Sequence, residues 1–268
     1  GDTPMQIFTL ASGSGGNCTL VREGETAVLI DAGISLRRIS TSLAELGLLM
    51  DDLSGILITH EHNDHICGLK TLVKHHDIPI FAPRTVANHL RYSVAGVEDF
   101  ITELIPGQEG SVGGFSVLPF HTPHDTPDSV VFRICGRLIF ASCTDCGHIT
   151  DEMLEGLSGA DIALIEANHD IEMLRAGSYP PQLKRRILSD FGHLSNKLSG
   201  ELAVKLYESG THQLILAHLS HENNDPYIAR RTVLAALSQE GISETAVSVA
   251  VAPEKEILQI ASKETAIC

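Results

Sequence analysis

The feature that most constrains the fold is a group of three histidines and one aspartate directly after a short apolar segment. The group consists of His60, His62, Asp64 and His65. Residues two apart on an extended backbone point to the same side, so His60 and His62 can bind one metal ion. Asp64 and His65 begin a helical pattern and can bind a second ion. We therefore predict a site for two divalent metal ions at the end of a buried strand; the alternative is a set of solvated loop residues.

The ligand types leave the identity of the metal open. Imidazole suits zinc, manganese, iron or nickel, whereas an aspartate oxygen suits a harder ion. The chain contains 14 histidines and no tryptophan, and imidazole is the commonest metal ligand in proteins. We expect two divalent ions, Zn, Mn, Fe or Ni, as cofactors.

Length and composition indicate a globular chain with one sizeable core, since 43% of its 268 residues are hydrophobic. No apolar run approaches the roughly 20 residues that span a bilayer, and the start lacks a signal-peptide pattern. We therefore expect no membrane association and a cytoplasmic location. The net charge of −15 argues against a protein that coats nucleic acid. It does not exclude a nuclease, because bound divalent ions reverse the local charge.

The six cysteines lack the regular spacing of a disulfide framework. Cys143 and Cys146 form an isolated Cys-x-x-Cys pair, for which a structural zinc site is not expected. Buried reduced thiols are the favoured interpretation, and a redox role is the alternative.

Apolar runs bounded by Gly, Pro and Asp alternate with helical patterns along the whole chain. The helical patterns cover residues 36–48, 64–75, 84–92, 149–156, 182–189, 195–208 and 225–238. This order predicts an α/β chain of two similar halves, packed sheet to sheet with helices outside, in a four-layer αββα sandwich. We see no linker or repeat and expect one domain over residues 1–268.

Polar and ionisable residues recur where the predicted strands end. They are Asp31, His60, His124, Asp145, Glu166 and His218. Loops at one edge of a rigid sandwich can converge on one site. We expect a single active centre there.

The His-x-His-x-Asp-His segment, together with LIDAG, SCTDCG and LILAHLSHENN, resembles the metallo-β-lactamase superfamily over nearly the whole chain. The resemblance implies that His124, with His121 as its competitor, completes the first ion's ligands. It further implies that Asp145 bridges the two ions, that His218 binds the second ion, and that Asp31 orients ligands without binding metal.

The assigned ligand sets are therefore His60, His62, His124 and Asp145 for the first ion and Asp64, His65, Asp145 and His218 for the second. Two adjacent ions can share a hydroxide that attacks a phosphorus or carbonyl centre.

Glu166 and His193 resemble a Glu–His pair in the phosphodiesterase branch of the superfamily, which includes ribonuclease Z. A carboxylate beside an imidazole raises the imidazole pKa, so His193 is predicted to donate a proton to the leaving group or to hold a phosphoryl oxygen. A histidine bonded to backbone at a helix start is the alternative. Asp64, Glu166 and His193 are the predicted catalytic residues.

An ordered series of segments is similar to the YycJ/WalJ branch of the superfamily: SGSGGNC, THEHNDHICGL, HDTPDS, TDCG, EANHDIEML, YPPQLKRRI, GHLSN and AHLSHENN. This similarity implies a metal-dependent exonuclease that degrades DNA from the 5′ end, with links to DNA repair. The interval from Asp145 to His218 leaves no room for a large inserted domain, which favours DNA ends or single strands over structured RNA.

Five further residues are predicted to bind substrate. They are Ser14, Asn17, His169, Lys184 and Asn223. The glycine-rich loop around Ser14 can present backbone amides to the site, or it is only a tight connection between strands. The basic run at residues 184–186 can hold a nucleic-acid backbone, or it is a solvated helix face.

Two other functions remain open from the sequence. The superfamily chemistry also serves thioesters, lactones and lactams, and the fold does not name the substrate. The other possibility is a non-catalytic regulatory protein with structural metals, which the complete ligand set disfavours. DNA as substrate is the leading prediction, and the oligomeric state is not predicted.

Overall fold

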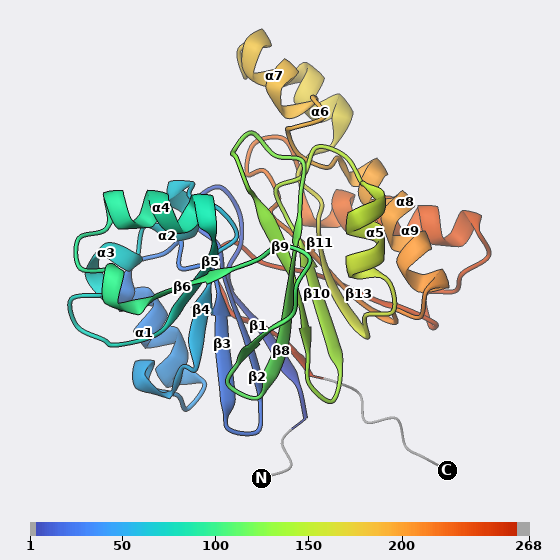
Figure 1. The fold of residues 1–268 in the computed structure, drawn as a ribbon. Helices are drawn as coiled ribbons and strands as arrows, with labels where there is room; N and C mark the ends of the chain where they lie inside the picture. Colours follow the sequence, from blue (N-terminus) through green and yellow to red (C-terminus); the bar gives the residue numbers. More distant parts are fainter. Residues whose placement is uncertain (1–3, 262–268) are drawn as a thin grey trace, which may run out of the picture.

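The computed structural model describes residues 4–261. Two seven-stranded sheets pack face to face, and helices cover the outer face of each sheet (Figure 1). This arrangement confirms the predicted four-layer αββα sandwich. Within residues 4–261, none of the helices has the length and apolarity needed to cross a membrane.

The first sheet has the strand order β14-β1-β2-β3-β4-β5-β6. Its strands are β1 (Gln6–Ala11), β2 (Cys18–Glu23), β3 (Thr26–Ile30), β4 (Gly55–Leu57), β5 (Ile80–Pro83), β6 (Ile101–Leu104) and β14 (Leu258–Ala261). Strands β3 to β6 are parallel. Their carboxyl ends therefore meet at one edge of the sheet.

The second sheet has the strand order β13-β12-β11-β10-β9-β8-β7. Its strands are β7 (Gly110–Val112), β8 (Phe115–His121), β9 (Val130–Cys135), β10 (Ile139–Cys143), β11 (Ile162–Glu166), β12 (Gln213–Ala217) and β13 (Ser248–Val251). Strands β10 to β13 are parallel. Their carboxyl ends again share one edge.

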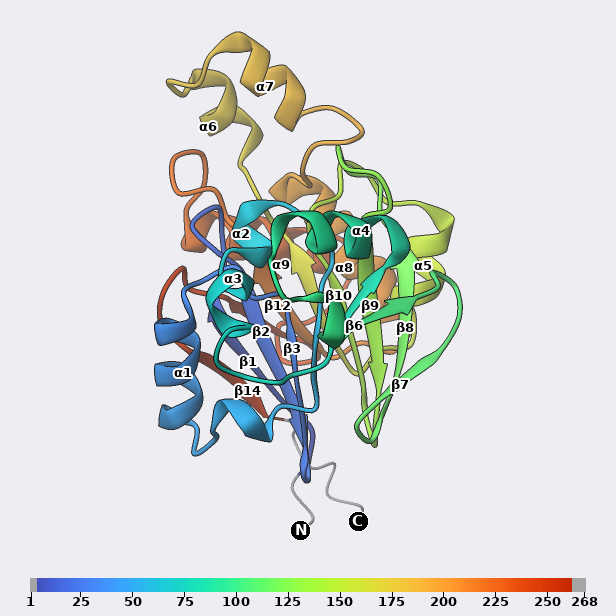
Figure 2. The same ribbon diagram turned by 60° about the vertical axis from the view of Figure 1, so that its left-hand side comes forward.

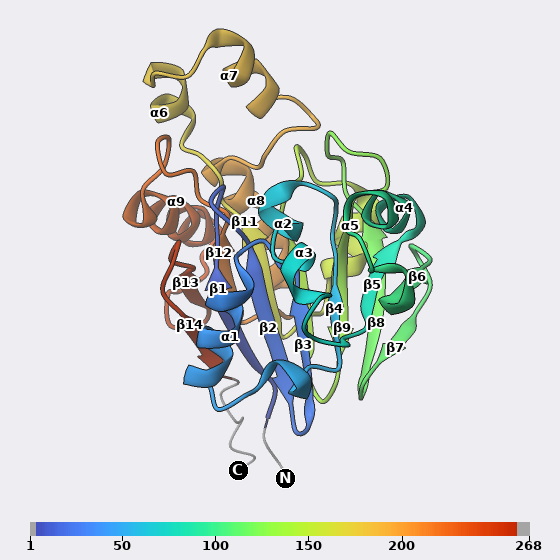
Figure 3. The same cartoon turned by 90° about the vertical axis from the view of Figure 1, so that its left-hand side faces the viewer.

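The helices form the two outer layers (Figures 2 and 3). Those of the first half are α1 (Leu36–Glu45), α2 (Asn63–Ile66), α3 (Leu69–Leu72) and α4 (Arg84–Ser93), with the 3₁₀ turns η1 (Met50–Asp52) and η2 (Glu98–Phe100). Those of the second half are α5 (Asp151–Leu157), α6 (Ile171–Ala176), α7 (Pro181–Ile187), α8 (Asn196–Glu208) and α9 (Pro226–Gln239). Helices α6 and α7 stand apart from the sandwich, above its upper edge in Figures 1 and 3.

The core has three layers of buried apolar side chains. The middle layer joins the two sheets, and it includes Val28 and Leu57 of the first sheet and Phe132 and Ile215 of the second. One outer layer lies between the first sheet and its helices, and the other lies between the second sheet and its helices. Successive side chains of a strand point to opposite faces, and both faces of these strands are buried. Nearly every position is therefore apolar, which explains the nearly continuous apolar runs in the sequence.

The helix predictions agree with the structure at most positions, and the differences have local causes. The pattern over residues 64–75 forms two short helices, α2 and α3, which meet at Gly68. A Cβ at Gly68 would lie 2.3 Å from the carbonyl oxygen of Ile34, so the break brings the chain close to that loop. Helix α6 was not predicted, nor were strands β6, β7 and β14.

Three residues within two positions of a strand end have left-handed backbone, with φ of 62° at Asp31, 56° at Asp145 and 58° at His218. Residues other than glycine seldom adopt this conformation, which costs on the order of 1–3 kcal/mol and is concentrated at functional sites. It turns the chain sharply where the strand ends. All three side chains lie at the same edge of the sandwich.

Candidate metal centre

The loop between β4 and α2 carries two members of the first cluster of potential ligands, His60 and His62. His60 is buried, and its Nε2 atom lies 3.1 Å from Nδ1 of His62. His124 reaches the same place from the loop after β8. Ligand atoms of these three histidines all lie within 4.8 Å of one another. Burial is the main cause that lowers the pKa of both His60 and His124, and this favours the neutral imidazole that a metal ion requires.

A second cluster consists of Asp64, His65 and His218, whose ligand atoms also lie within 4.8 Å of one another. Nε2 of His65 lies 3.4 Å from Oδ2 of Asp64, and Nε2 of His218 lies 3.8 Å from the same oxygen. His218 comes from the end of β12, in the other half of the sandwich. The cluster therefore spans the edge where the two sheets meet.

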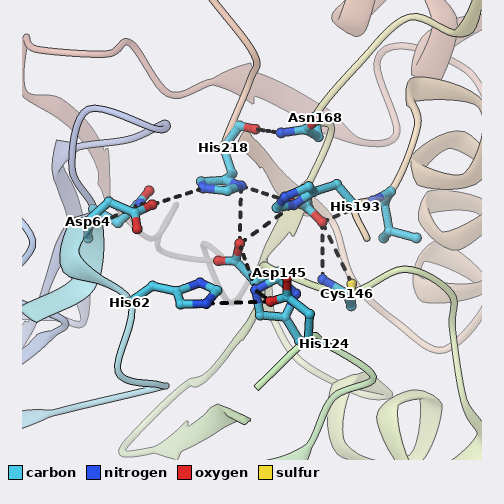
Figure 4. Close-up of polar contacts among 12 residues, drawn as sticks. His62, Asp64, His124, Asp145, Cys146, Asn168, His193 and His218 are labelled. Atoms are coloured by element: carbon cyan, nitrogen blue, oxygen red, sulfur yellow. Dashed lines mark hydrogen bonds and ion pairs between the residues drawn. The ribbon is translucent and has the colours of Figure 1, made fainter. Parts of the chain in front are cut away.

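Asp145 lies between the two clusters. Its Oδ1 atom is 3.8 Å from Nε2 of His124, and its Oδ2 atom is 3.2 Å from Nε2 of His65. Burial alone would raise the pKa of Asp145, but His218 and His65 outweigh it and hold this pKa well below its usual value. One ionised carboxylate thus faces both groups of imidazoles (Figure 4).

The residues present fit a pair of divalent cations. Several buried ligand atoms have no hydrogen-bond partner within the described residues: both ring nitrogens of His124, Oδ2 of Asp145 and Nε2 of His218. A buried polar atom without a partner is costly. Each of these residues belongs to a cluster of imidazole and carboxylate groups, the donors that divalent transition metals bind.

Asp31 holds His65 from behind. Its Oδ2 atom accepts a hydrogen bond from Nδ1 of His65 at 2.7 Å, and its Oδ1 atom accepts one from the backbone of Thr59 at 2.9 Å. Asp31 is not in any cluster of potential metal ligands among residues 4–261. A carboxylate in this position fixes the tautomer and ring orientation of a metal-binding histidine, which is the role predicted for it.

Glu166 holds two histidines at once. Its Oε1 atom accepts hydrogen bonds from Nδ1 of His193 at 2.8 Å and from Nδ1 of His218 at 2.7 Å. Its Oε2 atom accepts one from the backbone of Leu194 at 3.0 Å. Burial alone would raise the pKa of Glu166, but His193 and His218 hold it at about 2. Glu166 therefore stays ionised and leaves Nε2 of both imidazoles facing the site.

A cavity of about 250 Å³ opens beside the clusters. Its floor includes His62, Asp64, His124, Asp145, His193 and His218. Its wall includes Tyr179, Leu183, Arg186 and Ile187 from the α6–α7 region, and Phe191. The helices that stand apart from the sandwich thus form one side of the site.

Of the predicted substrate-binding residues, Ser14 lines this cavity. The amide of Asn17 instead donates to the Gly13 carbonyl at 2.9 Å and to Oδ2 of Asp64 at 3.3 Å. Asn17 therefore holds the glycine-rich loop against α2. The same amide nitrogen lies 3.3 Å from Nε2 of His65, so Asn17 contacts the predicted ligands but does not line the cavity.

His169, Lys184 and Asn223 do not line the cavity. His169 and Asn223 are each 1% exposed. Lys184 donates to the carbonyls of Arg175 and Gly177, both at 2.7 Å, and so ties α7 to the end of α6. In the basic run it is Arg186 that reaches the cavity, because residues two apart on a helix point in different directions. Of these two residues, Arg186 and not Lys184 lines the cavity.

The competitor for the first cluster, His121, lies elsewhere. Its side chain is 50% exposed, and Nε2 is 3.1 Å from Oδ1 of Asp128. His124 occupies the cluster, as the similarity to the family implied. Asp125 was overlooked although it follows His124 directly: its Oδ1 atom lies 3.4 Å from Nε2 of His124 and 3.5 Å from Nε2 of His62.

Cys143 and Cys146 are both fully buried, and their sulfur atoms lie 3.4 Å apart as free thiols. The backbone amide of Cys146 donates to Oε2 of Glu166 at 3.3 Å. The pair therefore packs behind Asp145 as part of the core, and no cluster of potential metal ligands among residues 4–261 includes either thiol.

Comparison with known proteins gives three consistent results. The family model described as "Metallo-beta-lactamase superfamily" matches residues 11–159. Exodeoxyribonuclease YycJ of Bacillus anthracis is 36% identical over 241 residues, which cover 88% of this chain and 90% of that protein. Exodeoxyribonuclease WalJ of Streptococcus pneumoniae is 37% identical over 236 residues, covering 86% of this chain and 87% of that protein.

A solved structure, the metallo-beta-lactamase fold protein YhfI from Bacillus subtilis, superposes with a TM-score of 0.71 at 17% identity. The superposition covers 96% of this chain and 99% of that one. At this identity the likeness concerns the fold alone.

Proposed function

The chain belongs to the metallo-beta-lactamase superfamily, and from its site we propose that it is a metal-dependent phosphodiesterase that degrades DNA as a 5′–3′ exonuclease. One arrangement carries the proposal: Asp145 lies between two histidine clusters, and the Glu166–His193 pair stands beside them at the cavity. Relatives that match most of the chain are named exodeoxyribonucleases.

We propose His60, His62 and His124 as ligands of one ion and Asp64, His65 and His218 as ligands of the other, with Asp145 between them. Each of these two sets is among the groups whose ligand atoms lie within 4.8 Å of one another, and a further such group joins Asp145 and His218 to Glu166 and His193. Two divalent ions at such a site supply electrophilic activation of water and of a phosphoryl oxygen. The ligand set suits zinc, manganese, iron or nickel alike.

The chain's own residues supply the proton and the orientation. His193 is partly exposed at the cavity, with Nδ1 bound to Glu166 and Nε2 left for the substrate. Burial alone would lower the pKa of His193, but Glu166 and Asp145 outweigh it and raise this pKa. The protonated imidazole can then donate its proton to the leaving alkoxide of the nucleotide.

A cavity of about 250 Å³ is just below the usual range of roughly 300–1,000 Å³ for ligand pockets. It suits a terminal nucleotide better than both strands of a duplex. This supports removal of nucleotides from an end. The 5′ polarity, a role in DNA repair and a cytoplasmic location are proposed from the similarity to YycJ and WalJ.

The test is a metal-reconstituted assay on 5′-labelled single- and double-stranded DNA, run beside a thioester and a lactam. The proposal predicts stepwise release of nucleotides from the 5′ end and no such release by Asp145→Ala. It would be overturned by robust thioester turnover without DNA cleavage in the presence of any of the four metals.

A further inference from the structure

Resting on this proposed function, we propose that Arg186 and Tyr179, on the α6–α7 wall, bind the terminal nucleotide of a single DNA strand. Arg186 would hold an oxygen of the phosphodiester that is cleaved, and Tyr179 would stack on the terminal base. Both residues lie outside the two histidine clusters.

The first observation is the ion pair between Arg186 and Asp125. Nε of Arg186 donates to Oδ2 of Asp125 at 2.8 Å, and the terminal nitrogen Nη2 contacts the same oxygen. The other oxygen of Asp125 lies 3.5 Å from Nε2 of His62 and 3.4 Å from Nε2 of His124. One carboxylate therefore connects the guanidinium to the first histidine cluster.

A carboxylate and a phosphodiester each carry two anionic oxygens, and the Nε and Nη2 donors of a guanidinium can bind an oxygen of either anion. Asp125 thus marks where an anionic group fits between Arg186 and His62. A phosphodiester in that place would direct one oxygen to Arg186 and the other to the metal site. The exposed side of the ion pair allows this exchange, since the Arg186 side chain is 61% exposed.

The charge of the cavity lining is the second observation that favours Arg186 as the phosphate contact. Within the described residues that line the cavity, Arg186 is the one lysine or arginine. The chain as a whole carries a net charge of −15, which repels a polyanion at long range. A fixed cation at the site is therefore needed to hold the phosphate after it arrives.

The third observation is the aromatic side chain of Tyr179 on the same wall, with Phe191 nearby in the cavity lining. Phe191 is 57% exposed. A cation next to aromatic rings is the combination that binds single-stranded nucleic acid, because every base offers a face for stacking. A base inside a duplex is already stacked and paired, so the wall selects an unpaired end.

The test measures binding of two uncleavable single-stranded oligonucleotides to the metal-loaded enzyme by fluorescence anisotropy. One carries a charged 3′-methylene phosphonate at the first linkage, and the other carries a neutral methylphosphonate there. Arg186→Gln should lower the preference for the charged oligonucleotide about tenfold. Arg185→Gln, an exposed neighbour that does not line the cavity, should leave it unchanged, and Arg186→Lys should lower it partly.

Stacking is tested with an oligonucleotide that lacks the first base. Tyr179→Leu should reduce the preference for the complete oligonucleotide about tenfold, and Tyr92→Leu, which alters a tyrosine 93% exposed on α4, should not. If Arg186→Gln and Arg185→Gln showed the same preference for the charged oligonucleotide, and the wild-type enzyme still cleaved DNA, the inference would be overturned and the proposed function would remain intact. A wild-type enzyme that neither binds nor cleaves DNA would overturn both.

Discussion

Oε1 of Glu166 lies 2.8 Å from Nδ1 of His193, beside the candidate metal centre. The same oxygen holds His218 at 2.7 Å, so one buried carboxylate orients both a predicted proton donor and a predicted metal ligand. The proposed phosphodiesterase requires a proton donor in this position, whereas a site that only binds metal does not.

Replacing His193 with alanine removes the proton donor but none of the assigned metal ligands. On DNA we expect kcat to fall about 100-fold or more, while the content of divalent metal stays at the wild-type value. Steady-state kinetics and metal analysis of the same preparation check both parts. Unchanged DNA turnover in His193→Ala would exclude the proposed role.

The pH profile of Glu166→Gln tests how the proton donor is tuned. The pKa of His193 is raised mainly by Glu166 against the effect of burial, and the proposed role as proton donor requires the protonated form. Activity should therefore decline as pH rises through this pKa, and the decline should begin at lower pH in Glu166→Gln. Profiles of kcat/KM against pH for the wild type and Glu166→Gln measure the pH at which activity declines. The same decline in both proteins would argue that Glu166 does not raise the pKa of His193.

Removal of metal should destabilise the fold. Ions that bind only the folded state add about 2.7 kcal/mol per site at 100 times the dissociation constant, so chelation should lower Tm by about 5 °C or more. Asp145→Ala should lose most of this response, because its carboxylate faces both clusters. The matched control is His121→Ala at the end of β8, which should respond to chelation as the wild type does.

Gly33 tests the position of the helix that carries Asp64 and His65. A Cβ at Gly33 would lie 1.6 Å from the backbone oxygen of Asp64, so Gly33→Ala must push α2 away. We expect weaker metal binding and lower thermal stability. Gly110→Ala, where the nearest atom is a flexible Leu104 methyl at 3.3 Å, should retain metal binding; equal metal affinity in the two variants would contradict this account of the loop.

Buried His169 should make the protein sensitive to mild acid. Its Nδ1 atom lies 3.2 Å from Oδ1 of Asn168, and its Nε2 atom has no hydrogen-bond partner among residues 4–261. Burial lowers the pKa of His169 to about 4, below its ordinary value near 6.5. Since the unfolded chain binds this proton more readily, stability falls as pH drops below about 6.5, by about 2 kcal/mol at about pH 5.

Urea unfolding at about pH 7 and about pH 5 measures this loss. In His169→Gln the difference between the two pH values should be smaller by about 2 kcal/mol. A difference as large as in the wild type would assign the acid sensitivity to other groups.

The sandwich could be predicted from the sequence because strands buried on both faces appear as continuous apolar runs. The helices between them are recognised by apolar residues that recur every three to four positions. The sequence also placed the residues of both histidine clusters at strand ends, where parallel strands bring distant segments together. The strands and the group from His60 to His65 are local features that spacing reveals, whereas His124, Asp145 and His218 were assigned to the site through the resemblance to the superfamily.

Other features depend on contacts between distant residues. The pairing of Arg186 on α7 with Asp125 in the loop after β8 joins residues 61 positions apart, and no local pattern indicates it. Lys184 was preferred in the same run because a sequence does not show which of three adjacent basic side chains faces a cavity. The left-handed backbone at Asp145 and His218 is imposed by packing, since neither residue type requires it.

The central claim is that side chains from both halves of the sandwich hold two neighbouring divalent ions. Anomalous diffraction from crystals of the metal-loaded protein tests it most directly. We predict two peaks about 3.5–4 Å apart, one among His60, His62 and His124 and the other among Asp64, His65 and His218, with Asp145 between them. Ions bound elsewhere, or no bound ions in protein that cleaves its substrate, would contradict the claim.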